Sequence, residues 1–229
     1  MEKQSAPAAK PIVLKDVKAN PKVNELIVGA NELLRSMGYT EHGHRHVGIV
    51  SSITRYIMEN LGMPQREIEL GMIAGYLHDI GNVINRHDHP MVGASVTFTI
   101  LNEMGMPPEE LVPILGAIGN HEVLAGTPVS YMSAAVIIAD KSDVHKSRVQ
   151  NPTIETFDIH DRVNFAVQKS RVEMDSEKKQ VELTLEIDTE FATVMEYFEI
   201  FITRMVMCRS AASLFGYEFT LSVNGTSLA

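Results

Sequence analysis

The sequence of 229 residues lacks tryptophan and has a single cysteine, Cys208. It has no apolar run of the roughly 18–20 residues that a membrane-spanning helix requires. The beginning, MEKQSAPAAKPIVLKDVK, has no continuous apolar stretch of the kind found in secretory signals. Cys208 alone can form neither an intrachain disulfide nor a thiolate zinc site. These absences favour a cytoplasmic protein in a reducing compartment.

Positive charge is also scarce, because 20 Lys and Arg face 29 Asp and Glu for a net charge of −9. Binding to extended nucleic acid depends on clustered Lys and Arg that neutralise phosphates. We therefore expect neither a nucleic-acid nor a membrane partner. A small phosphorylated metabolite or nucleotide is still compatible with this charge, because metal ions can supply positive charge locally.

The length and patterning predict one main domain with an appendage. Residues 1–19 are expected to form a flexible N-terminal arm, residues 20–150 a helical bundle, and residues 151–229 a C-terminal α+β segment. Apolar residues recur at helical spacing through the middle part, with breaks at Gly and Pro. The expected helices of the bundle lie near residues 20–37, 43–62, 64–80, 107–119 and 129–146. One more helix is expected to begin at Pro90.

The last third of the chain changes character. A short helix is expected over residues 155–167, and apolar and polar residues alternate over 181–187 as in a strand. The segment 171–175 is predicted to pair with that strand as a hairpin. Apolar residues over 191–205 share one helical face, and alternation returns over 217–223. The prediction is a mainly α fold, a helical bundle with a small β-β-α-β extension.

Histidine is the conspicuous residue, since eight of the nine histidines fall between positions 42 and 145. Several occur with aspartate at predicted helix ends or on inward-facing positions. Four histidines and two aspartates suit two divalent ions with one bridging carboxylate, and the cores of helical bundles hold such sites. The six residues are His46, His78, Asp79, His89, His121 and Asp140.

Taken singly, each of these residues has a simpler explanation. A lone histidine on a core-facing stripe, such as His46, is more often a hydrogen-bonded core residue than a ligand. Asp140 follows the apolar run Val136–Ala139 and could form a salt bridge. The metal interpretation gains its weight from the set of six, which come from different helices of one bundle.

The motifs resemble those of the HD-domain superfamily of metal-dependent phosphohydrolases. The matching segments, in order, are HGHRHVGIV, HDIGN, HPMVGAS, GNHE and IADKSD. Their order is that of the dinuclear branch and is similar to the HD-type diadenosine tetraphosphate hydrolases, and more distantly to the HD-GYP phosphodiesterases. The resemblance covers roughly residues 40–145.

The resemblance implies an all-α core and two divalent transition-metal ions, Fe or Mn first, with Mg, Zn, Ni or Co as alternatives. It implies that Asp79 bridges the two ions. The remaining ligands would divide between the ions as His46, His78 and Asp140 on one side and His89 and His121 on the other.

Some positions depart from the family pattern. Relatives often carry Lys where Asn82 stands, and HD-GYP proteins carry a second His where Asn120 stands. The GYP tripeptide is absent, which disfavours cyclic di-GMP as substrate. A second His-Asp pair, His160 and Asp161, has no matching partners nearby and is interpreted as structural.

Further residues next to the expected ligands are assigned to substrate and proton transfer. Arg45, Arg86, His87 and Lys141 are candidates for binding phosphate. Glu122 is a candidate proton acceptor, and we expect it to act in catalysis with His78 and Asp79.

The predicted function is metal-dependent hydrolysis of a phosphate ester or anhydride, in a nucleotide or dinucleotide, through a metal-bound hydroxide. Two alternatives remain open on sequence grounds. One is a di-iron oxygenase such as inositol oxygenase, which uses the same ligand types. The other is a non-catalytic nucleotide-sensing module, which the intact ligand set disfavours. We also expect a homodimer.

Overall fold

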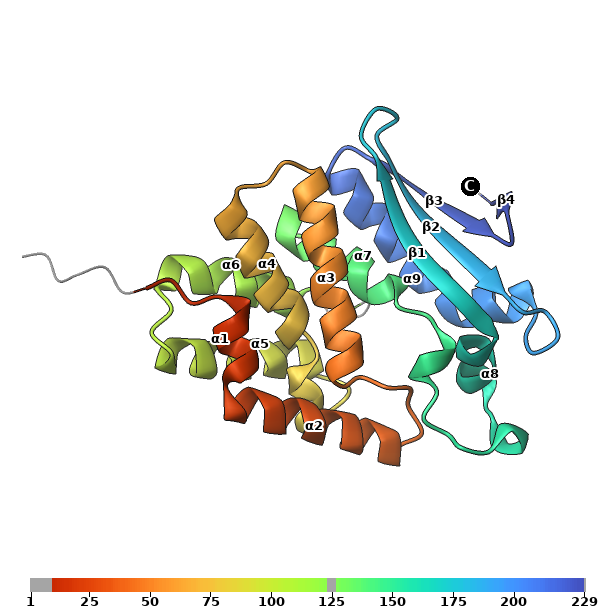
Figure 1. Ribbon diagram of the computed structural model, residues 1–229, viewed down its shortest axis with the longest axis horizontal. Coiled ribbons are helices and arrows are strands. Elements are labelled where there is room, and N and C mark those ends of the chain that lie inside the picture. The colour runs from red at the N-terminus through yellow and green to blue at the C-terminus, as the bar shows by residue number, and fades with distance from the viewer. Residues whose placement is uncertain (1–9, 123–126, 229) are drawn as a thin grey trace, which may run out of the picture.

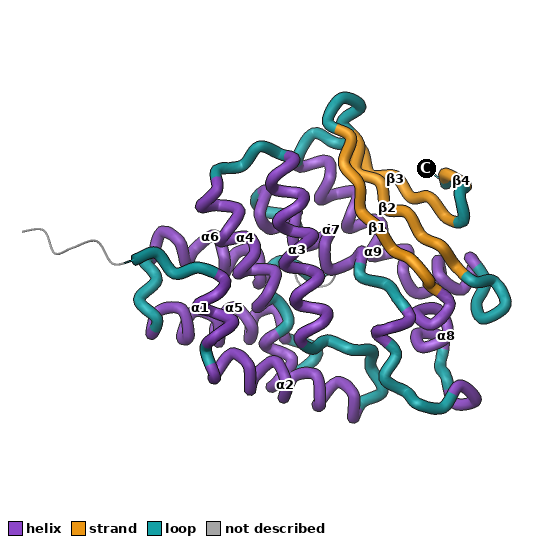
Figure 2. Tube along the Cα trace, viewed as in Figure 1, coloured by secondary structure: helices purple, strands orange, loops and turns teal. Residues whose placement is uncertain are grey.

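The computed structural model describes residues 10–122 and 127–228. A bundle of helices forms one part, and a small sheet lies against one end of it (Figures 1 and 2). None of the described helices has the length and apolar character needed to cross a membrane. The bundle consists of α1 (Leu14–Ala19), α2 (Pro21–Ser36), α3 (His44–Asn60), α4 (Gln65–Leu77), the 3₁₀ turn η1 (Ile80–Val83), α5 (His89–Glu103), α6 (Pro108–Gly119) and α7 (Tyr131–Ser142).

The C-terminal part follows through two short 3₁₀ turns, η2 (Lys146–Arg148) and η3 (Ile154–Thr156). It contains α8 (Ile159–Ala166), β1 (Val167–Asp175), β2 (Gln180–Ile187), α9 (Val194–Leu214), β3 (Glu218–Val223) and β4 (Thr226–Ser227). β1 and β2 form an antiparallel hairpin, α9 crosses over, and β3 pairs with β2 in parallel. The predicted mainly α fold with a β-β-α-β extension is confirmed.

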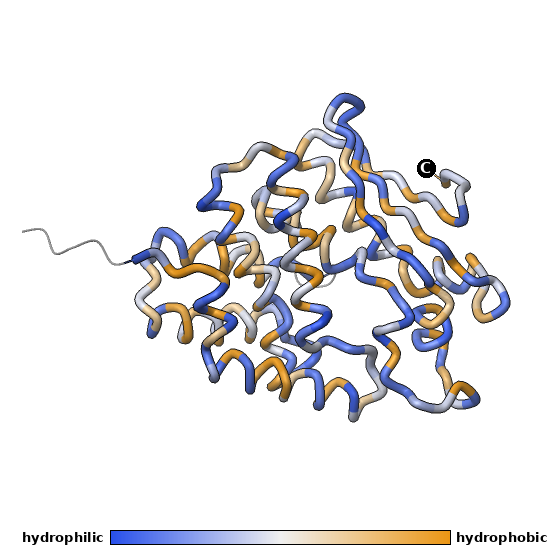
Figure 3. The backbone as a smooth tube through the Cα atoms, in the orientation of Figure 1, coloured by the Kyte–Doolittle hydropathy of each residue, from blue (hydrophilic) through white to orange (hydrophobic). Residues whose placement is uncertain are grey.

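Helix α9 joins the two parts, because it packs on α7 on one side and on β3 on the other. Side chains alternate along β2, where Val181, Leu183 and Leu185 are buried and the residues between them are more exposed. The same alternation is visible as orange and blue segments along the strands in Figure 3. β2 therefore buries one face against the helices. β3 differs, because its residues from Phe219 to Val223 are buried on both faces.

Two expectations near helix starts need correction. The flexible arm predicted for residues 1–19 is wrong for its last part, because α1 forms over Leu14–Ala19 with Leu14 and Val17 buried. Residues 1–9 lie outside the described part. The helix expected over 155–167 begins only at Ile159, because the Asp158 side chain caps it by accepting a hydrogen bond from the Asp161 amide.

Gly81 fixes the distance between η1 and α5. A Cβ on Gly81 would overlap the backbone of His89 and lie 2.9 Å from Gly93 Cα. Only glycine lets these two backbones approach so closely. This contact sets the positions of the residues that flank Gly81, Asp79 on one side and His89 on the other.

We predict that Gly81→Ala lowers the free energy of unfolding by more than about 2 kcal/mol, because two backbone segments must move apart. Gly116→Ala is the matched control, since a Cβ there meets nothing within 4 Å inside α6. That change should raise stability by about 0.4–1 kcal/mol. Urea unfolding of both variants is the measurement, and equal effects of the two substitutions would contradict the prediction.

Candidate metal centre

The six predicted ligands sit at or next to the ends of bundle helices. His46 lies in the first turn of α3, and His89 is the first residue of α5. The other four are His78 directly after α4, Asp79 directly before η1, His121 just past α6, and Asp140 in the last turn of α7. Helix ends from across the bundle therefore meet at one point.

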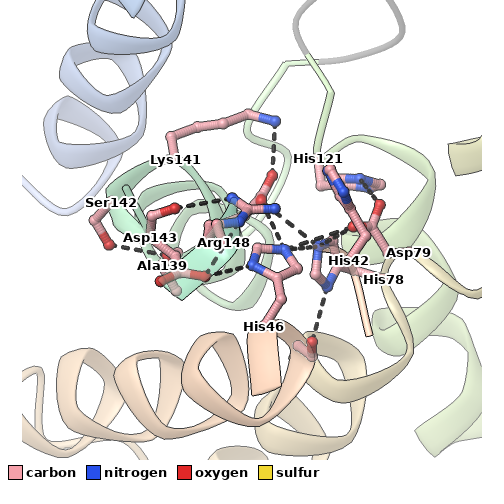
Figure 4. A network of polar contacts seen from close by, with 12 residues as sticks. His42, His46, His78, Asp79, His121, Ala139, Lys141, Ser142, Asp143 and Arg148 are labelled. Atoms are coloured by element: carbon pink, nitrogen blue, oxygen red, sulfur yellow. Dashed lines mark hydrogen bonds and ion pairs between the residues drawn. The ribbon is translucent and has the colours of Figure 1, made fainter. Parts of the chain in front are cut away.

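The structure brings all six together in its interior. The four histidines and Asp79 are almost completely buried, and Asp140 is partly buried. Figure 4 shows His46, His78, Asp79 and His121 pointing toward one another from separate segments. Their polar atoms form two groups that share the carboxylate of Asp79.

The first group surrounds Oδ2 of Asp79. This atom lies 3.5 Å from His46 Nε2 and 3.3 Å from His78 Nε2. The two Nε2 atoms are 3.3 Å apart. Oδ1 of Asp140 completes the group, at 3.3 Å from His46 Nε2 and 3.6 Å from His78 Nε2.

The second group surrounds the other oxygen of the same carboxylate. Oδ1 of Asp79 lies 3.3 Å from His89 Nε2 and 3.8 Å from His121 Nε2. These two Nε2 atoms are 3.0 Å apart, and Glu122 Oε2 is 4.0 Å from His89 Nε2. Asp79 therefore has one oxygen in each group.

These separations fit ligands around a metal ion. Ligand atoms at about 2.0–2.2 Å from an ion lie about 2.8–3.6 Å from one another in tetrahedral or octahedral arrangements. The distances within both groups fall in or just above that range. Both groups fit a divalent cation, with Asp79 placed to bridge.

The far ring nitrogen of each histidine is held by an outer oxygen. Three of the four partners are backbone carbonyls, which can only accept, so Nδ1 must carry the proton. Each Nε2 therefore directs a lone pair inward. The Nδ1 partners are Asp143 Oδ2 (2.7 Å) for His46, Gly75 O (2.9 Å) for His78, Arg86 O (2.8 Å) for His89 and Ile118 O (2.6 Å) for His121.

Inward lone pairs at these distances repel each other unless a proton or a cation lies between them. Burial and Arg148 oppose protonation of His46, yet hydrogen bonds to three carboxylates raise its pKa to about 9. Burial opposes protonation of His78 as well, but Asp79 and Asp140 raise its pKa to about 10. Burial lowers the pKa of His89 to about 4. The donor set thus demands positive charge, which divalent ions would supply.

Asn82 explains the first departure from the HD pattern. Its side-chain amide donates to Asp79 Oδ1 at 2.8 Å and to the Asp79 carbonyl at 3.0 Å, and so fixes the orientation of the carboxylate. Positive charge comes instead from Arg86, whose guanidinium donates to Asn82 Oδ1 at 3.4 Å and to Glu122 Oε2 at 3.3 Å.

A cavity of about 300 Å³ opens onto this cluster. Asp79 and Asp140 line it, together with Glu122, Arg86 and Lys141. Lys141 donates to Asp140 Oδ2 at 2.7 Å and to Glu122 Oε1 at 3.3 Å. Two of the four residues predicted to bind phosphate, Arg86 and Lys141, therefore face the cavity.

The other two predicted phosphate ligands do not line this cavity. Arg45 donates twice to Asp143, at 2.9 and 3.1 Å, and supports the carboxylate that holds His46. The expectation that Arg45 binds phosphate stays a prediction, and the structure places its guanidinium on Asp143. His87 is exposed and lies in a neighbouring groove with Arg86, His89 and Glu122.

Sequence reasoning missed several residues of the cavity wall. His42 lines the cavity, and burial lowers its pKa well below the usual value. His160, interpreted as structural, also reaches the wall, together with Arg148 and Arg204. Nothing in the sequence pattern marked Arg204, because it lies on α9, far along the chain from every expected ligand.

Residues 43–155 match the model of the HD domain family. This segment contains all six clustered histidine and aspartate residues. A crystal structure described as a predicted HD superfamily hydrolase from an uncultured Thermotogales bacterium is similar, with a TM-score of 0.43 and 21% identity over 58% of this chain and 75% of that chain. No curated protein shows a significant match to the chain.

We predict that Asp143→Asn weakens metal binding about 10- to 100-fold, because Asp143 orients His46 and raises its basicity. The measurement is a competition titration of Mn²⁺ against a chelator. Asp175→Asn is the control, since Asp175 caps only the turn of the β1–β2 hairpin. Metal affinity that is unchanged in Asp143→Asn would show that this carboxylate does not support the centre.

Proposed function

We propose that the chain is a metal-dependent phosphohydrolase that acts on a small phosphorylated metabolite or a nucleotide. The observation that carries the proposal is the carboxylate of Asp79, which has one oxygen in each of two histidine-rich donor groups. The HD match over residues 43–155 supports the same interpretation. Two divalent ions held there would lower the pKa of a bound water and neutralise charge on a phosphoryl group.

The charge of the cavity favours an anionic substrate once cations are bound. Its wall carries five acidic side chains and four Lys or Arg side chains. Alone it is close to neutral and slightly negative, which suits the uptake of cations. Two divalent ions would make it clearly positive, and such a site binds phosphate well.

We assign separate roles to three residues around the donor groups. Arg86 and Lys141 contact a phosphoryl group held at the centre, since both already face the cavity and interact with acidic residues on its wall. Glu122 accepts the proton from the attacking water. Its two oxygens accept hydrogen bonds from Lys141 and Arg86, which hold it at the cavity side of the second donor group.

The volume of the cavity limits the size of the substrate. A volume of about 300 Å³ is at the lower end of the range of about 300–1,000 Å³ for small-molecule sites. A sugar phosphate or a mononucleotide fits this space better than a whole dinucleotide. We therefore favour these smaller substrates over the diadenosine tetraphosphate suggested by the motifs. A cytoplasmic location and a homodimer stay predictions.

The test of the activity is a phosphate-release screen over nucleotides and sugar phosphates, with Mn²⁺ and under strict anaerobiosis. We expect release of inorganic phosphate from at least one of them without consumption of oxygen. Activity that requires iron and oxygen, with no turnover of any phosphate ester, would favour an oxygenase and overturn the proposal.

We predict that His46→Ala loses at least one metal ion per chain and at least about 100-fold in turnover, because it removes a donor from the first group. His44→Ala is a close control, since His44 lies on the same helix, is exposed and bonds to the Tyr76 hydroxyl. Elemental analysis of the purified variants gives the metal content. Equal metal loss in both variants would mean that His46 acts through folding alone.

A further inference from the structure

Arg204 is the one arginine or lysine of the cavity wall with no bonding partner among the described residues. The other three are already engaged: Arg86 with Glu122, Lys141 with Asp140, and Arg148 with the carbonyls of Glu41 and Asp143. The guanidinium of Arg204 makes neither a hydrogen bond nor an ion pair within residues 10–122 and 127–228.

The position of Arg204 is nevertheless well defined. Its Cζ lies 4.6 Å from the centre of the Phe201 ring, and the Phe201 ring stacks on Tyr197 at 4.9 Å. Burial lowers the pKa of Arg204, and the charges of Asp140 and Glu122 act in the opposite direction. A guanidinium has five N–H donors, and those of Arg204 have no acceptor among the described residues. Such a group facing a cavity favours the binding of an anion there.

Arg204 lies outside the donor cluster, although the charges of Asp140 and Glu122 act on it. Arg204 comes from α9, which supplies none of the six clustered residues, and it lies beyond ion-pair distance of Asp79 and Asp140. Arg86 and Lys141, in contrast, already contact the residues around the cluster. Arg204 therefore lines the same cavity without bonding to the donor groups.

We propose that Arg204 binds a second phosphoryl group of the substrate, so that the enzyme prefers substrates with two phosphoryl groups over those with one. The proposal rests on the function proposed above. It also gives the segment after residue 155, outside the HD match, a role in selecting the substrate. Guanidinium groups suit this task, because they bind phosphate through two parallel hydrogen bonds.

The test measures binding rather than turnover, with matched ligand pairs and calorimetry on Mn²⁺-loaded protein. The pairs are fructose 6-phosphate with fructose 1,6-bisphosphate, and AMP with ADP. For at least one pair we expect the doubly phosphorylated ligand to bind about 10-fold or more tightly, as a charge-assisted hydrogen bond would give. Arg204→Met should abolish that preference and leave the affinity for the singly phosphorylated ligand within about two-fold. Arg204→Lys should retain part of the preference.

Arg209→Met is the control, because Arg209 is an exposed arginine on the same helix. Three results would overturn the proposal: no preference in wild-type protein for either pair, equal loss for both ligands of a pair in Arg204→Met, or the same effect in Arg209→Met. Failure of the proposed function is a different result. If Arg204 discriminates between the ligands of a pair but no substrate releases phosphate, the second phosphoryl site is supported and the proposed hydrolase activity is rejected.

Discussion

The carboxylate of Asp79 is the feature on which the rest of the centre depends. It is buried, its two oxygens face different pairs of histidines, and Asn82 fixes its orientation. A buried carboxylate is unfavourable unless positive charge or hydrogen bonds compensate it. The charge of His78 and hydrogen bonds from neighbouring histidines hold the pKa of Asp79 well below its usual range, although burial acts in the opposite direction. The surrounding helix ends place histidine nitrogens beside both oxygens.

The histidines are oriented by a device that is local in sequence. His78, His89 and His121 each donate from Nδ1 to the backbone carbonyl three residues earlier. Two of these carbonyls belong to the last turns of α4 and α6, where helical carbonyls lack partners within the helix. One hydrogen bond thus satisfies the helix end and aims Nε2 at the cluster. His46, at the start of its helix, has no such carbonyl behind it and uses the distant Asp143 instead.

This contrast explains how much of the molecule could be predicted from the sequence. Helical periodicity, Pro and Gly breaks and the His-Asp spacing suffice for the bundle, for the strands after residue 167 and for the six clustered residues, since each signal lies within a few positions. Asp143 and Arg204 could not be found in that way. Asp143 acts on His46 across 97 residues, and Arg204 reaches the cavity only because α9 packs on α7. Arg45 was assigned to phosphate only because it is next to His46 in sequence. In the structure its guanidinium donates two hydrogen bonds to Asp143.

The cavity is lined by residues from both the helical bundle and the C-terminal segment. The donor groups come from α3 to α7 and their connections, whereas α8 and α9 contribute part of the wall through residues such as His160 and Arg204. Under the proposed function, catalysis and substrate selection would be carried by different segments. If Arg204 binds the substrate as proposed, a change in α9 would alter anion preference and leave the donor cluster in place, because no residue of α9 bonds to any of the six. Arg204 stacks on Phe201, and Phe201 stacks on Tyr197 in the core of the C-terminal segment. The position of the guanidinium therefore depends on how α9 packs between α7 and the sheet.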